Sequence, residues 1–284
     1  GVGMLLSVVI QLAFARRYLG EVGIVPGAKR ARALAGGVKE PLTAVERDRI
    51  RVVFVMFVFV MMFWAAFEQA GGLMNLFADR YTDRVLGSFT VPTGWFQSLN
   101  PLFIVTLGPV LAWLWSRLGE TGRNPATPVK MFIGLFLVAV GFVFLVFAVF
   151  EMQTAADAKA GMMWLVLAYL FHTLGELCIS PVGLSMITKL APLRLASLMM
   201  GFWFLINFFA NTLAGYVGAF SGNMGEYPWM ISIAGDLGVR PEHAGLLGIF
   251  GGITLVLVVF GALLWALSGR IVGWMHGADD VRKA

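Results

Sequence analysis

The sequence predicts an all-α integral membrane protein, and three observations support this fold class. Hydrophobic residues make up 59% of the 284 residues and charged residues only 13%, whereas a soluble domain carries about 25% charged residues. Apolar runs of roughly 20 residues recur along the chain, which is the length that crosses the hydrocarbon core of a bilayer as a helix. Segments rich and poor in Lys and Arg alternate between these runs, as they do in proteins that cross a membrane several times.

The chain contains seven apolar runs, and the first of them is shorter than the others. The run at about 2–15 has no basic region before it and no cleavage site, so it does not fit a signal peptide. We expect it to be the end of a helix that begins upstream. The six full spans are 52–78, 95–115, 131–150, 161–187, 198–220 and 246–268. We therefore expect a partial last span of one bundle at 1–15, a linker at 16–51 and a six-helix bundle at 52–284.

The distribution of Lys and Arg predicts the orientation in the membrane. Segment 16–51 holds nine of the 21 basic residues, and alternate segments together hold 17 on one side and four on the other. The positive-inside rule places the linker and the C-terminus in the cytoplasm. The net charge of +5 then reflects topology and contact with membrane lipid. No nucleic acid is needed as a partner.

A partial span, a cytoplasmic linker and six full spans resemble half of a twelve-helix transporter. In the major facilitator fold, two six-helix bundles are joined by such a linker and the substrate site lies between them. The expected architecture is the C-terminal six-helix bundle of a major facilitator fold plus a partial preceding helix. This architecture does not identify the cargo.

Two carboxylates lie well inside predicted spans, Glu68 and Glu176. An ionised carboxylate in hydrocarbon is costly unless it is paired, hydrated or protonated, and no Lys or Arg lies inside a span to pair it. A carboxyl group held between a desolvating environment and a nearby cation can bind and release a proton as its surroundings change. Proton coupling requires such a group. The alternative is a neutral structural acid that is hydrogen-bonded to backbone or amide groups.

Polar residues on the first full span indicate a cavity. Glu68, Asn75 and Asp79 are spaced i, i+7 and i+11, which places them on one face of a continuous helix. Gly71 and Gly72 interrupt this span and permit a bend or a close approach of another helix.

The other polar candidates lie on the second, fourth and fifth full spans. Asn100 stands before Pro101 on the second, and Trp203 lies on the fifth. His172, Glu176 and Ser180 are spaced i, i+4 and i+8 on the fourth.

Metal and disulfide chemistry are disfavoured by the sequence. The stretch at His172 reads FHTLGE rather than H-E-x-x-H, so the ligand pair and general base of a zinc hydrolase are absent. We expect His172 to line a pore or to pack. The single cysteine, Cys178, excludes an internal disulfide and a cysteine metal cage, and we expect it to be a small apolar residue of a helix.

Three blocks of sequence resemble the proton-dependent oligopeptide transporter (POT) family. They are FWAAFEQAGGLMNLFADRYTDR (63–84), WFQSLNPLFIVTLGPVLAWLW (95–115) and HTLGELCISPVGLSMITKLAP (172–192), the last followed by MMGFWFL (199–205). The segment PLTAVERDRI (41–50) also resembles the lead-in to the seventh helix of family members. The resemblance covers nearly the whole chain. It implies import of di- and tripeptides across the plasma (inner) membrane, with protons as the coupling ion and without a cofactor.

The resemblance also implies roles for individual residues. In the family the acid of the FEQ stretch, here Glu68, takes part in proton coupling and in a gating salt bridge to the N-terminal half. The acid of GELC, here Glu176, helps to bind the amino terminus of the peptide and pairs with a lysine of the N-terminal half. The Asn of QSLNP, Asn100, contacts the peptide backbone or terminus. Ser180 and Trp203 match positions that line the peptide pocket.

The chain also departs from the family pattern. The first-helix stretch E-x-x-E-R-F is absent together with the half that carries it, and the linker 16–51 has no room for the two extra helices of many bacterial members. Gly71 and Gly72 stand where the family often has Ser-Ser or Thr-Ser. Asp79 is a candidate gate residue. The missing N-terminal half is expected as a partner, beside short peptides, protons and lipid.

Two other functions remain open at this point. One is transport of another solute, such as nitrate, an amino-acid derivative or a drug. The other is a non-transporting membrane scaffold, against which the two intramembrane acids argue because unneeded buried charges are costly. A membrane enzyme is disfavoured, since no nucleophile–base pair and no metal set is evident.

Overall fold

The computed structural model describes residues 2–19 and 41–278, so most of the expected linker 16–51 lies outside the described residues. Helix α1 (Val2–Leu19) contains the short apolar run at the start of the chain and continues past position 15.

Six helical stretches of this segment are long and apolar enough to cross a membrane, which confirms the predicted number of full spans. Each is longer than its apolar run, and all but α8 extend beyond the run at both ends. They are α3 (Ala44–Phe67) with η1 (Glu68–Ala70) and α4 (Leu73–Tyr81); α5 (Gly94–Gln97) with α6 (Leu99–Glu120); α7 (Thr127–Thr154); α8 (Met162–Leu190); η2 (Leu193–Leu195) with α9 (Ala196–Met224); and η3 (Pro241–His243) with α11 (Ala244–Trp274).

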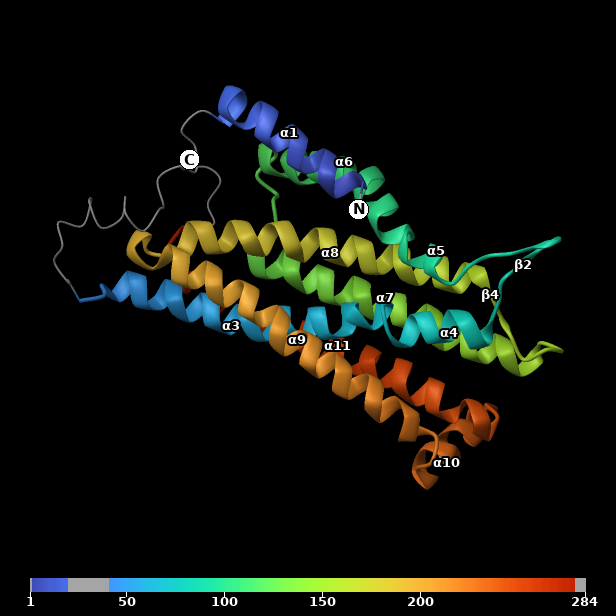
Figure 1. The fold of residues 1–284 in the computed structure, drawn as a ribbon. Helices are drawn as coiled ribbons and strands as arrows, with labels where there is room; N and C mark the ends of the chain where they lie inside the picture. Colours follow the sequence, from blue (N-terminus) through green and yellow to red (C-terminus); the bar gives the residue numbers. More distant parts are fainter. Residues whose placement is uncertain (1, 20–40, 279–284) are drawn as a thin grey trace.

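Short elements that the sequence did not predict lie at one end of the bundle, away from the start of α3 (Figure 1). Strand β1 (Thr82–Asp83) pairs in parallel with β4 (Ala160–Gly161), which ties the end of α4 to the start of α8. Strands β2 (Val85–Leu86) and β3 (Phe89–Thr90) form a hairpin that turns at Gly87, whose φ is +63°. Helix α10 (Pro228–Asp236) follows α9.

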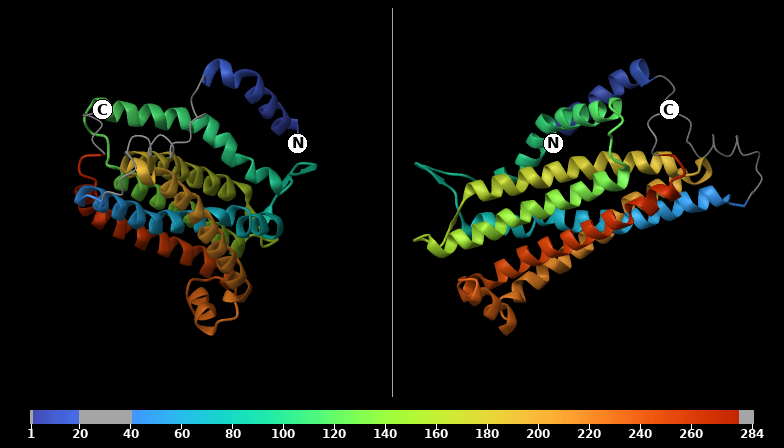
Figure 2. Two further views of the ribbon diagram at one scale, coloured as in Figure 1. Left: turned by 60° about the vertical axis from the view of Figure 1, so that its left-hand side comes forward. Right: turned by 180° about the vertical axis from the view of Figure 1, so that it is seen from behind.

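Successive long helices run in opposite directions, so the basic segments gather at the other end of the bundle (Figures 1 and 2). Helix α7 packs against both α8 and α11 in the core, where Phe142 and Phe250 are completely buried. Helix α6 packs on α8, and none of its own residues is buried within the described part of the chain. This exposed helix leaves one side of the bundle open.

A seam of glycines brings α7 and α8 into close contact. A Cβ atom added at Gly134 would lie 2.5 Å from Ile179, and one added at Gly175 would lie 2.7 Å from the carbonyl oxygen of Gly134. At Gly141 the added atom would lie 2.4 Å from the ring of His172. Small residues at a helix interface let backbones approach closely, which stabilises helix pairs in membranes.

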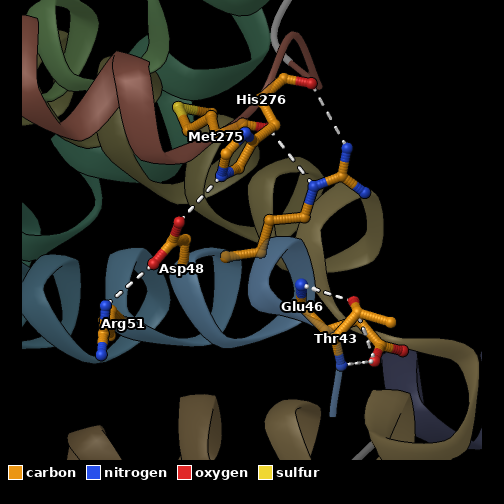
Figure 3. A network of polar contacts seen from close by, with 7 residues as sticks. Thr43, Glu46, Asp48, Arg51, Met275 and His276 are labelled. Atoms are coloured by element: carbon orange, nitrogen blue, oxygen red, sulfur yellow. Dashed lines mark hydrogen bonds and ion pairs between the residues drawn. The ribbon is translucent and has the colours of Figure 1, made fainter.

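The basic end of the bundle is joined by the polar contacts of Figure 3. A capping box begins α3, in which the Thr43 side chain and the Glu46 carboxylate bond each other's backbone N–H groups. Asp48 contacts Arg51 at 2.9 Å and the Nε2 atom of His276 at 2.9 Å. These contacts tie the start of α3 to the end of α11, and exposed pairs of this kind contribute about 0.2–1 kcal/mol each.

Candidate functional site

The first spanning segment is broken at the position of its acid. Helix α3 ends at Phe67, Glu68 begins the 3-10 turn η1, and α4 starts only at Leu73 after Gly71 and Gly72. The predicted bend at the two glycines is therefore confirmed. The prediction that Glu68 and the polar residues of α4 share one continuous helix face is wrong, because the interruption separates them.

Hydrogen bonds join the interrupted segment to two other helices, α8 and α9. The Tyr169 hydroxyl of α8 donates to the carbonyl oxygen of Ala70 at 3.3 Å. The Gln69 amide, which is 2% exposed, donates to Ala65 at 3.0 Å and to the carbonyl oxygen of Ala214 in α9 at 3.2 Å. Backbone groups that a break in the helix leaves unpaired must be satisfied within the protein in a membrane, and these contacts fix the break between α8 and α9.

Asn100 and Glu176 meet across the contact between α6 and α8. The Asn100 amide donates to Oε2 of Glu176 at 2.8 Å and to the hydroxyl oxygen of Thr173 at 3.1 Å. The Thr173 hydroxyl in turn donates to the carbonyl oxygen of Tyr169 at 2.7 Å. A hydrogen bond to an ionised carboxylate is roughly twice as strong as one between neutral groups. Asn100 therefore fixes the position of the Glu176 carboxylate while the side chain stays partly exposed.

Glu68, like Glu176, is a half-buried acid inside a spanning segment. No Lys or Arg in the described residues forms an ion pair with either acid. A carboxylate in a spanning segment without a paired cation favours taking up a proton or binding an external cation.

Ser180 and Trp203 take no part in the hydrogen bond between Asn100 and Glu176. Ser180 lies one turn beyond Glu176 on α8 and is half-buried. Trp203 of α9 is 7% exposed, and its ring packs against Phe57 and over Gly183, where an added Cβ atom would lie 2.2 Å from it. In this half of the site Trp203 is therefore a packed wall rather than an open surface.

Asp79 belongs to a second hollow. It forms an ion pair with Arg84 at 3.0 Å and lines a pocket of about 570 Å³ between α4 and α9, together with Asn75 and Ser221. The Oδ1 atom of Asn75 is buried without a hydrogen-bond partner in the described structure. This pocket is distinct from the Asn100–Glu176 site.

His172 is a packing residue. It is 1% exposed, and its ring centroid lies 4.6 Å from that of Phe142 across the seam between α7 and α8. Of the two expectations for His172, lining a pore or packing, the structure fits packing. Within the described residues no group of three His, Cys, Asp or Glu side chains could hold a metal ion.

Sequence reasoning missed Thr173, Tyr169 and Gln69. Tyr169, Thr173 and Glu176 are spaced i, i+4 and i+7, which is one face of a helix, so the periodicity could have revealed two of them. Gln69 is adjacent to Glu68 and gives no comparable signal, because only the break in the helix turns it into the interface with α9.

Six spanning helices, one of them broken beside an unpaired acid, define an integral, multi-pass membrane protein of the secondary transporter type. A family model described as "POT family" matches residues 35–230. The chain belongs to the POT family, as the sequence blocks indicated, and its fold is that of the C-terminal half of a major facilitator transporter.

Curated relatives agree with this assignment. The chain is 42% identical over 173 residues to "Peptide transporter YePEPT" of Yersinia enterocolitica subsp. palearctica, covering 61% of this chain and 34% of the relative. It is 32% identical over 226 residues to "Dipeptide and tripeptide permease B" of Salmonella typhimurium, covering 80% of this chain and 45% of the relative. The chain thus spans less than half of the length of these two proteins. Since the relatives are transporters or permeases, the prediction that the chain is not an enzyme is confirmed.

A solved structure shows the same arrangement of helices. The peptide transporter POT, crystallised as a mutant in complex with alafosfalin, matches with a TM-score of 0.69 and 31% identity. The match covers 96% of this chain and 52% of that one.

Proposed function

We propose that this chain is the C-terminal half of a proton-coupled symporter of di- and tripeptides. The observation that carries the proposal is the pair of acids: Glu68 and Glu176 are half-buried inside spanning segments and form no ion pair with a Lys or Arg of the described residues. The relatives named as peptide transporters support the choice of cargo.

The chemistry divides between the two acids. Glu176, fixed by Asn100, suits the ammonium group at the amino terminus of a peptide, because a carboxylate and a cation form a charge-assisted hydrogen bond. Glu68 sits in a short turn with no fixed partner in the described residues, so its proton occupancy can change with the state of the transporter. Ser180 and Trp203 complete the wall of the peptide site, and Asp79 acts at a gate.

The remaining parts of the proposal follow from the same assignment. Protons are the coupling ion and no cofactor takes part. An N-terminal half of the same transporter supplies the other wall of the cavity and the cations that pair with the two acids. The protein lies in the plasma (inner) membrane with the basic end of the bundle, the linker and the C-terminus in the cytoplasm.

Replacement of the coupling acid tests the proposal. In the transporter that contains this chain, Glu68→Gln should abolish uphill accumulation of a labelled dipeptide driven by a pH gradient. Counterflow exchange of dipeptide should persist, because the amide keeps the shape and hydrogen bonding but cannot exchange a proton. Glu46→Gln, at the basic end of α3, is the matched control and should accumulate dipeptide normally. Normal accumulation by Glu68→Gln would refute Glu68 as the coupling group, and the absence of dipeptide uptake in the unmodified transporter would refute the cargo.

A further inference from the structure

Another pocket, distinct from the one that Asp79 lines, lies between α6 and α8, beside the start of α7. Its volume is about 410 Å³, and the residues that line it come from positions 108–115, 124–130 and 177–189. Lys189, in the last turn of α8, lies 13 residues beyond Glu176, which is about 20 Å along a helix. The pocket therefore extends from Leu177, next to Glu176, to the basic end of the bundle, and neither Asn100 nor Glu176 is among the residues that line it.

The lining of this pocket is positively charged. It contains Lys130 and Lys189 and no Asp or Glu. It also carries groups that donate hydrogen bonds, the hydroxyls of Thr127 and Ser185 and the indole of Trp115. Two cations with neutral donors and no acid form an environment suited to an anion.

The start of α7 adds to this preference. Helix α7 begins at Thr127 with no side-chain cap and no acid in its first turn. The N-terminus of a long helix carries a partial positive charge and stabilises anions. Lys130 lies in the second turn, where a cation is disfavoured by the same dipole. An anion in the pocket would be attracted both to Lys130 and to the start of α7, and Lys189 stands at the C-terminal end of α8, where a cation is favoured.

Trp115 provides an independent observation. Its Nε1 atom is buried and has no hydrogen-bond partner in the described structure, although a buried indole N–H normally finds one. The ammonium of Lys130 lies 5.0 Å from the centroid of the same ring. An indole donor without a partner and a lysine charge thus belong to the same wall of the pocket.

The position of the pocket relative to the membrane surface indicates the source of its ligand. Trp113, two residues from Trp115, is 59% exposed, and Arg117 lies over its ring at 5.7 Å. Exposed Trp beside Arg and Lys at a helix end is typical of the membrane–water interface. Basic pockets between spanning helices on the cytoplasmic side bind the headgroups of anionic lipids.

We propose that this pocket binds a phosphate oxyanion at the membrane surface, carried by the headgroup of an anionic phospholipid or present as free phosphate. Lys130 and Lys189 supply the charge, and the Trp115 indole and the start of α7 supply oriented donors.

Binding of defined ligands to the purified protein tests the proposal. Native mass spectrometry would count retained phosphatidylglycerol, with phosphatidylcholine as the zwitterionic lipid and inorganic phosphate as the free ion. Lys130→Gln/Lys189→Gln should weaken phosphatidylglycerol binding by roughly tenfold or more, since each surface cation contributes about 1 kcal/mol to attraction for anionic lipid. Trp115→Phe keeps the ring but removes the donor, and should weaken binding roughly two- to tenfold.

The matched control is Arg80→Gln/Lys159→Gln, which removes two exposed charges from the other end of the bundle. It should leave binding unchanged. Inorganic phosphate that competes in a lysine-dependent manner would identify the free ion as a source, and lysine-dependent binding of the lipid alone would identify the headgroup. If the two double variants lose phosphatidylglycerol equally, or if no phosphate ligand depends on the two lysines, the proposal is wrong and the lysines serve another partner, such as an acidic segment of the other half of the transporter.

Discussion

The carboxylate of Glu176 is bonded by a single side chain in the described part of the chain, the amide of Asn100, which donates at 2.8 Å. The side chain is partly exposed, so the carboxylate keeps acceptor capacity for a ligand. A carboxylate fixed in this way presents a directed acceptor without requiring a conformational change when a cationic ligand arrives. This preorganisation lowers the entropy lost on binding.

Replacing Glu176 should therefore affect one class of ligand selectively. In the transporter that contains this chain, we expect Glu176→Gln to weaken binding of a dipeptide with a free amino terminus by roughly 10- to 150-fold, because a charge-assisted hydrogen bond contributes about 1.5–3 kcal/mol. The same dipeptide in N-acetylated form should bind poorly to both proteins and change little. Competition binding of the two forms measures the difference, and equal losses would assign Glu176 to the fold or a gate.

The contact between Asn100 and Thr173 should appear as a coupling energy. We expect Asn100→Ala and Thr173→Val to be non-additive by about 0.5–1.5 kcal/mol in thermal unfolding of the purified protein, because one hydrogen bond joins them. Thr106→Val is the control partner, since the Thr106 hydroxyl bonds only carbonyls of its own helix, at Leu102 and Phe103. Additive effects for Asn100 and Thr173 would show that the bond is absent in solution.

The sequence predicted some site residues better than others, for physical reasons. Glu68 and Glu176 could be found because a carboxylate inside an apolar run is costly and rare. Thr173 could not, because Thr in a helix commonly bonds the carbonyl four residues earlier, and its acceptance of the Asn100 amide depends on how α6 packs on α8.

At the scale of elements, the glycine seam between α7 and α8 sets how closely the two helices approach. Gly141→Ala should lower the free energy of unfolding by about 1–3 kcal/mol, since the added methyl group overlaps the ring of His172, which is enclosed by Phe142. Gly252→Ala in α11 has open space at its Cβ position and should be neutral or slightly stabilising. Thermal unfolding of the purified protein compares the two; equal melting temperatures would show that the seam relaxes without cost.

The interruption between α3 and α4 could be predicted from the sequence only in part. Two adjacent glycines predicted a bend in the first full span, and the structure has one there. The spacing of Glu68, Asn75 and Asp79 did not predict their arrangement across the bend. Helical periodicity applies only while the hydrogen-bonding pattern is continuous. The contacts that hold the break, from Tyr169 and Gln69, are tertiary and could not be read from local sequence.

At the scale of the whole molecule, the hydropathy of the chain predicted all six full spans. The short strands and α10 were missed because elements of two to nine residues carry little periodicity.

The orientation in the membrane is predicted from charge alone and can be tested by cysteine labelling, starting from the one cysteine that the protein contains. Cys178 is 1% exposed and should not react with a membrane-impermeant maleimide.

New cysteines in exposed connections should then report the side of the membrane. We expect Thr121→Cys, between α6 and α7, to react only in inside-out vesicles. Ala156→Cys, between α7 and α8, should react in intact cells. Cys178→Ser serves as the unreactive background for both. The opposite pattern would invert the proposed orientation.

The bond from Gln69 to the carbonyl oxygen of Ala214 also has a consequence for biogenesis. Its partners are 145 residues apart in the chain, whereas the seam between α7 and α8 joins positions as close as Gly141 and His172. At about 5–20 residues per second, a ribosome needs roughly 10–30 s to add the chain that Gln69 requires. Until then the first span carries a polar amide and an acid in lipid without their permanent neighbours. This nascent span is therefore the segment of the chain most dependent on late-arriving helices for its residence in the bilayer.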